Sequence, residues 1–255
     1  MLKRKKQQKY LVKRCLEIRR QLRAFADSGS QEALHKLRVE IKKIRAFEKF
    51  AVPGKENAKR MKTIREIFHR AGIIREANIN LQMMKQYHIN HPAFSTEATQ
   101  TLRQESEQFR LHAAGYDQYI RNTVSALLRA TRPVRNRDIR HWAARQLKKI
   151  AAGVTALSTD QLHEARKSIK NLLYVHGILP ERLVERLNLN IPYLDQLQDD
   201  IGKWHDTALA VDLLASGGAG NKTKIIKLKK EQDKMSDAVH AASDGFWDKA
   251  VQPSP

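Results

Sequence analysis

The chain has 255 residues, and its hydrophobic content of 41% is enough to build a core and too high for a disordered tail. Its 48 Lys and Arg residues outnumber 27 Asp and Glu, which gives a net charge of +21 at pH 7. A charge of this size favours polyanionic partners. The single cysteine, Cys15, excludes an internal disulfide and a cysteine-based zinc site, and it suggests a reducing compartment.

Nothing in the sequence predicts a membrane span or a secretory signal. The longest stretches without charge, near residues 86–96 and 150–159, reach about half of the roughly 18 residues that a span needs. The basic start of the chain does not lead into an apolar segment, as a secretory signal would. We therefore expect a soluble, cytoplasmic protein with no membrane partner.

Apolar residues recur at spacings of three and four along most of the chain, as in Leu34, Leu37, Ile41 and Ile44. This period is typical of helices, and internal prolines interrupt it at intervals. The sequence therefore predicts an all-α protein. The predicted helices cover 4–27, 30–51, 55–88, 95–130, 134–152, 159–178, 181–215 with a break at 190–192, and 222–249.

A short motif occurs twice in these helices. The segment from Ser30 to Arg38 resembles the segment from Ser158 to Arg166, and the two histidines differ by 163 − 35 = 128 positions. Each serine is placed to cap a helix five residues before its histidine. An internal repeat follows from this match.

A second motif repeats further along, where Gly72-Ile-Ile-Arg-Glu76 corresponds to Gly202-Lys-Trp-His-Asp206. Each half then contains four predicted helices, with domains at 1–131 and 132–255. Short connections favour antiparallel neighbours, so we expect two four-helix bundles.

Cations line one face of the predicted helix 30–51. On a helical wheel they lie within an arc of about 80° that borders the apolar side. Stacking like charges at this spacing costs about 0.2–0.5 kcal/mol per pair unless an anion or neighbouring acids compensate. We call this set the first stripe; its members are His35, Arg38, Lys42, Arg45 and Lys49.

The second stripe is thinner and contains His163, Arg166 and Lys170. Asn171 and Leu173 stand where the first copy has Lys43 and Arg45. On so basic a chain a run of cations is often only a solvated face. Its recurrence at matching places in two helices favours an anion site.

These segments resemble the CHAD family, named for conserved histidines in an α-helical domain. The resemblance implies two four-helix bundles related by pseudo-twofold symmetry, with a basic groove between them that binds inorganic polyphosphate. Granules of polyphosphate are then a further candidate partner. The ligand-facing residues that it implies are His35, Arg38, Lys42, Arg45, His163, Arg166 and Lys170.

Other residues near the two motifs are candidates for supporting roles. Glu76 takes the place of the family's usual Asp, and together with Asp206 we expect it to orient the cations; an ordinary surface ion pair is the alternative. Arg20 and Lys148 match each other in the preceding helices. The candidates for additional anion contacts are Arg20, Lys43, Lys49, Arg75, Lys148, Lys167 and His205.

Polyphosphate has no bases, so it needs dense cations and no stacking surfaces. With 6% aromatic residues this chain offers few such surfaces, which makes nucleic-acid binding the second choice. Carboxylate and histidine pairs such as Glu32 with His35 leave a metal-dependent phosphohydrolase as a third, but Arg38 and Lys42 would repel a dication. We expect no catalysis, no cofactor and no metal.

Overall fold

The computed structural model describes residues 1–52, 54, 57–156, 158–216 and 222–251. In these residues the chain forms helices and no strand, with two isolated bridges that join Leu2 to Val134 and Leu189 to Val251. The all-α prediction is confirmed. The chain divides into two compact units, which we call the N-terminal unit, Leu2–Val134, and the C-terminal unit, Arg135–Pro255 with Met1.

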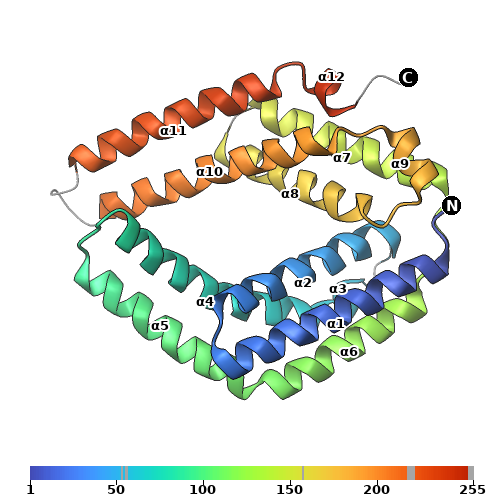
Figure 1. The fold of residues 1–255 in the computed structure, drawn as a ribbon, viewed down its shortest axis with the longest axis horizontal. Coiled ribbons are helices and arrows are strands. Elements are labelled where there is room, and N and C mark those ends of the chain that lie inside the picture. Colours follow the sequence, from blue (N-terminus) through green and yellow to red (C-terminus); the bar gives the residue numbers. More distant parts are fainter. Residues whose placement is uncertain (53, 55–56, 157, 217–221, 252–255) are drawn as a thin grey trace. The chain divides into compact units, whose positions relative to one another are not determined.

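The described part of the N-terminal unit consists of five long helices and the short helix α3 (Figure 1). Helix α1 packs against α2 and α6, and α4 packs against α2 and α5. Fully buried Ile, Leu and Phe side chains from α1, α2 and α4 fill the space between them. The helices are α1 (Arg4–Ser28), α2 (Gln31–Ala51), α3 (Asn57–Arg60), α4 (Lys62–Gln86), α5 (Pro92–Leu111) and α6 (Ala113–Ala130).

The prediction of one helix over 95–130 is wrong, because the chain breaks at His112 into α5 and α6. Aromatic packing accounts for the break. The rings of Phe109 and Tyr116 lie 4.9 Å apart, and Phe109 also meets Phe25 of α1 edge-on at 5.5 Å. A bend between Phe109 and Tyr116 lets α5 follow α4 while α6 follows α1.

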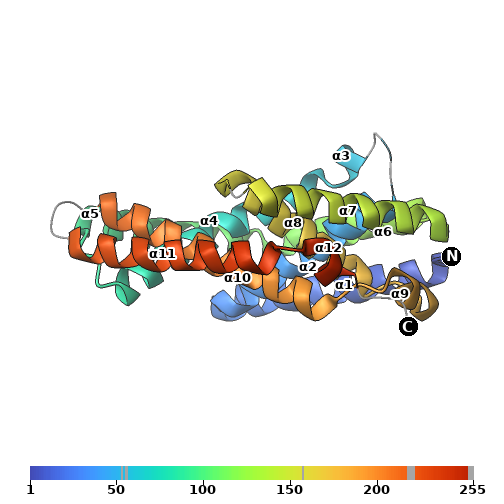
Figure 2. The ribbon, with the colours of Figure 1, turned by 90° about the horizontal axis from the view of Figure 1, so that it is seen from above.

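In the C-terminal unit, α7 packs against α8, and α10 packs against both α8 and α11. Figure 2 shows α11 lying along α10. The helices are α7 (Asn136–Ala156), α8 (Thr159–His176), α9 (Glu181–Leu187), α10 (Ile191–Ser216), α11 (Lys222–Ser243) and α12 (Phe246–Ala250).

Three other predicted helices are interrupted. The break expected at 190–192 occurs slightly earlier, at 188–190, since α9 ends at Leu187 and α10 begins at Ile191. The helix predicted over 222–249 stops at Ser243, because Gly245 adopts the left-handed conformation with φ 59°. The helix predicted over 55–88 is divided into α3 and α4 at Met61, and positions 55–56 lie outside the described residues.

Candidate cationic anion site

Helix α2 holds the first stripe next to the core. The Ser30 hydroxyl accepts a hydrogen bond from the Ala33 amide at 3.2 Å, and Ser158 does the same for Gln161 at 3.4 Å, so both predicted caps are confirmed. One face of α2 is buried through Leu34, Leu37, Ile41 and Ile44. On the bordering face Arg38, Lys42 and Arg45 are partly buried, whereas His35 and Lys49 are exposed.

Arg38 reaches across to α4 and is held there by the backbone. Its Nη1 donates a hydrogen bond to the carbonyl oxygen of Phe68 at 2.5 Å. The guanidinium lies directly over Gly72, where an added Cβ would stand 2.7 Å from Nη1. Arg38 of the first motif approaches Gly72 so closely that a larger residue would not fit, which explains the glycine of the second motif.

The C-terminal unit contains the same arrangement. Arg166 Nε donates to the carbonyl oxygen of Gln198 at 3.0 Å, and an added Cβ at Gly202 would stand 2.5 Å from Arg166 Nη2. In both units the accepting carbonyl lies four residues before the glycine. We call this local unit the arginine clamp: the arginine, the carbonyl that it bonds and the glycine beneath it.

Phe68 brings three cations of the first stripe together. Its ring centroid lies 4.1 Å from Arg38 Cζ, 4.9 Å from Arg45 Cζ and 5.9 Å from Lys42 Nζ. The sequence pattern did not single out Phe68. Its position one turn before Gly72 could have revealed it, because residues four apart share a helix face.

Burial and neighbouring positive charges both lower the pKa values of Arg38 and Arg45. Burial, followed by the charges of Arg75 and Arg45, lowers the pKa of Arg38 to about 10, while Glu76 opposes the shift. Burial and then Arg65 lower the pKa of Arg45, which Glu48 opposes. An anion at this place would relieve the repulsion.

In the second stripe, the pKa of Lys170 is also lowered, but its surroundings are more acidic. Burial and then Arg166 lower the pKa of Lys170, against the opposing charges of Asp199, Asp195 and Asp206. Two of these acids also bind the amide of Gln198, whose Nε2 donates to Asp199 at 2.5 Å and to Asp195 at 3.2 Å.

His163 and His205 meet in the C-terminal unit, with ring centroids 5.5 Å apart. Burial, followed by the charges of Lys167 and His205, lowers the pKa of His163. The Nδ1 atom of His205 is buried and has no hydrogen-bond partner within the described residues. The structure thus joins a predicted ligand, His163, to the additional candidate His205.

Several additional candidates are already paired with acids. Lys43 forms an ion pair of 2.6 Å with the buried Glu40, which also binds Arg14 of α1 at 2.7 Å. Lys43 therefore belongs to the contact between α1 and α2 more than to the stripe. In the same way Arg20 pairs with Glu17 and Lys167 pairs with Glu164, each at 2.7 Å.

Of the remaining candidates, some act on the pKa of a stripe cation and others are exposed. Arg75 lies near enough to Arg38 for its charge to lower the pKa of that guanidinium, and Asp206 acts on the pKa of Lys170. Glu76 acts on the pKa of Arg38 in the opposite sense to Arg75. Lys49 and Lys148 are exposed. Glu76 and Asp206 thus lie close enough to act on stripe cations through their charge.

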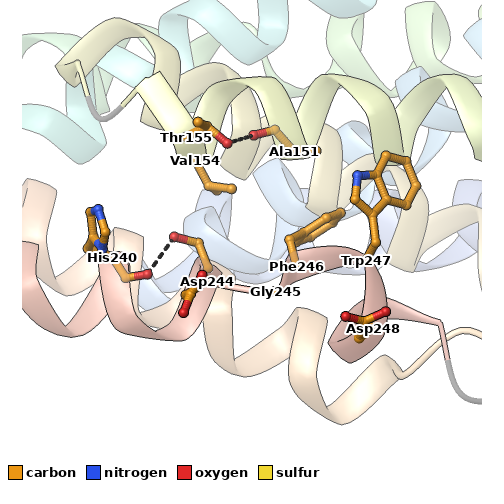
Figure 3. Close-up of a pocket in the computed structure, with 10 residues that line it drawn as sticks. Ala151, Val154, Thr155, His240, Asp244, Gly245, Phe246, Trp247 and Asp248 are labelled. Atoms are coloured by element: carbon orange, nitrogen blue, oxygen red, sulfur yellow. Dashed lines mark hydrogen bonds between the residues drawn. The ribbon is translucent and has the colours of Figure 1, made fainter.

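A pocket of about 330 Å³ lies in the C-terminal unit, where the end of α11 and helix α12 approach α7 (Figure 3). It is lined by Val154, Thr155, Asp244, Phe246 and Trp247 among others. No residue of either stripe lines it. The partly buried cations of each stripe therefore lie apart from this pocket.

Across the part of the chain that the structure describes, no group of three or more His, Cys, Asp or Glu side chains is arranged to hold a metal ion. In that same part, no helix combines the length and the apolar character that crossing a membrane requires.

The fold and the site together define an all-α protein in which partly buried cations are clamped between paired helices of each unit. The family model of the CHAD domain matches residues 12–215. Since this match covers most of the chain, the protein belongs to the CHAD domain family. No curated protein matches the sequence.

Proposed function

We propose that this protein is a non-catalytic module that binds inorganic polyphosphate through its two stripes. The observation that carries the proposal is the gathering of Arg38, Lys42 and Arg45 around one ring, partly out of water. Membership of the CHAD family is consistent with such a role. The first stripe is the main contact, and the second stripe adds to it.

The chemistry of the ligand matches this cluster. Each phosphate of a polyphosphate chain carries about one negative charge, and its oxygens accept hydrogen bonds from the forked guanidinium. Because Arg38 and Arg45 are partly buried, water competes less for these bonds than at an exposed site. A bound anion also raises the pKa of each cation, so charge on both partners is stabilised together.

The two rival functions are separated by competition and by product release. We expect single- and double-stranded DNA to displace long-chain polyphosphate poorly when phosphate concentrations are equal. Efficient displacement would favour a nucleic-acid-binding protein instead. We also expect no phosphate release from polyphosphate upon addition of Mg²⁺ or Mn²⁺; release that disappears in Arg38→Ala would establish an enzyme.

We further propose a cytoplasmic location, where polyphosphate granules are a candidate partner. The single Cys15 is compatible with a reducing compartment. Fractionation of cells that express the protein tests this directly, with the expectation that it is recovered with polyphosphate. Recovery in a fraction free of polyphosphate would contradict the partner.

A further inference from the structure

Phe68 occupies a special position in the N-terminal unit. It lies on α4 with its side chain partly exposed, one turn before Gly72. A cation within about 6 Å of an aromatic centroid is attracted to the negative face of the ring. Arg38, Arg45 and Lys42 all meet this distance, at 4.1, 4.9 and 5.9 Å.

These three cations repel one another, so their gathering requires an attraction. The charge of Arg45 is one of the causes that lower the pKa of Arg38. The carbonyl of Phe68 accepts a hydrogen bond from Arg38, and the charge of Glu48 acts on Arg45. The ring of Phe68 lies within about 6 Å of a cationic atom of each of the three residues.

We propose that Phe68 is the positioning residue of the anion site: its ring holds Arg38, Lys42 and Arg45 as a preformed cluster whose outward N–H groups bind phosphate oxygens. This inference rests on the proposed function and adds a role for a residue that carries no charge. A preformed cluster binds more tightly because fewer side chains have to be ordered when the ligand arrives.

The C-terminal unit has no such ring at the matching place. The residue that supplies the clamp carbonyl there is Gln198, which is buried and bound to Asp195 and Asp199. Arg166 is thus held by the carbonyl of Gln198, and Gln198 has no aromatic ring to support the guanidinium. Phe68 is therefore expected to make the first stripe the tighter of the two.

The test uses the full chain and three substitutions. Phe68→Leu keeps an apolar side chain but removes the ring, whereas Phe68→Tyr keeps the ring. Phe94→Leu is the matched control, because Phe94 is a partly exposed phenylalanine of the same unit whose recorded ring contact is with His91. Affinity for long-chain linear polyphosphate is measured by calorimetric titration, and folding by the helical spectrum and Tm.

We expect Phe68→Leu to weaken binding about tenfold, because it removes up to three cation–π contacts. Phe68→Tyr should stay within about twofold of the wild type, and Phe94→Leu should have no effect. Equal binding by Phe68→Leu and the wild type would overturn the inference. So would a loss of affinity in Phe68→Tyr as large as in Phe68→Leu, with both variants folded.

A second measurement needs no ligand. In the wild type the side-chain NMR signals of Arg38 should be shifted by the ring current of Phe68, and the shift should vanish in Phe68→Leu. Unshifted Arg38 signals in the wild type would reject the cluster. If the wild type fails to bind polyphosphate while these shifts are present, the proposed function fails and the cluster itself stands.

Discussion

The two units share the arginine clamp but surround it differently. In the N-terminal unit, Arg38 lies beside a phenyl ring and two further cations, and a single acid, Glu76, opposes its pKa shift. In the C-terminal unit, three aspartates oppose the lowering of the Lys170 pKa, and two of them accept hydrogen bonds from the amide of Gln198. The clamp is thus common to both units, while the dense cluster of cations belongs to the first.

This difference separates two roles of arginine, as a link between helices and as a contact for an anion. A clamped arginine connects α2 to α4, or α8 to α10, through a backbone carbonyl, whatever lies around it. Its use as an anion contact depends on the neighbours that remain uncompensated. The N-terminal unit should therefore dominate polyphosphate affinity, and the following changes test that order.

The largest effect is expected when the cations of one stripe are removed. Charged hydrogen bonds contribute about 1.5–3 kcal/mol each, so Arg38→Ala with Lys42→Ala should weaken polyphosphate binding about 100-fold or more. Arg166→Ala with Lys170→Ala should cost about tenfold, because acids already offset that stripe. Calorimetric titration measures both.

Arg103→Ala with Lys85→Ala serves as the control, since it removes the same charge from exposed positions of the N-terminal unit. It should change affinity only slightly, through the net charge. If all three double variants weakened binding equally, the comparison between the stripes would fail, and a diffuse electrostatic attraction would explain the binding.

Adding a methyl group beneath the clamp comes next in size. In Gly72→Ala the new Cβ would lie 2.7 Å from Arg38 Nη1, so the guanidinium must move away from the carbonyl. We expect about a tenfold loss of affinity, equivalent to one charged hydrogen bond. Gly202→Ala meets three atoms of Arg166 within 3.1 Å, so it should lower Tm but affect affinity less.

Gly115→Ala provides the contrast for both glycine variants. This helical glycine has no atom within 4 Å of an added Cβ. It should therefore raise stability by about 0.4–1 kcal/mol without changing affinity. A Gly72→Ala variant that behaved like Gly115→Ala would contradict the clamp.

A smaller effect is expected from pH, and it should arise in the C-terminal unit. Burial, Lys167 and His205 lower the pKa of His163, so this side chain is mostly neutral at pH 7 when no ligand is bound. A polyanion raises that pKa, so binding takes up a proton and affinity increases as pH falls from about 7.5 to 6. We expect a severalfold increase, smaller in His163→Gln; an unchanged pH profile in that variant would exclude His163.

The smallest expected effect is a gain. Asp199→Asn removes one of the negative charges that oppose the lowering of the Lys170 pKa. It keeps an oxygen that can accept the hydrogen bond from Gln198. Affinity for polyphosphate should rise about two- to fourfold, since an exposed charge contributes at most about 1 kcal/mol. A decrease would show that Asp199 supports the second stripe.

The fold class, both caps and the matched histidine, arginine and glycine motifs could be predicted because each depends on local sequence. The break at His112 could not, since it follows from the meeting of Phe109 and Tyr116 with Phe25 of another helix. The pairing of Lys43 with Glu40 was missed because Glu40 is also bound by Arg14 of α1. Helical periodicity alone cannot tell which of two neighbouring cations turns toward an acid.

The role of Phe68 was missed for a related reason. A phenylalanine on a predicted helix is usually a core residue, and its contacts with three cations come from the crossing of α2 and α4. The sequence showed the glycine motif only as a segment that occurs once in each half of the chain. Its physical meaning, a place for an arginine from the preceding motif, required the structure.

We expect polyphosphate to occupy the first stripe. Amine-reactive footprinting read by mass spectrometry tests it most directly, by comparing the labelling rate of each lysine with and without long-chain polyphosphate. We predict strong protection of Lys42, weaker protection of Lys170 and little change at Lys85 and Lys227. Uniform protection of exposed lysines, with Lys42 labelled as fast as in the free protein, would contradict the account.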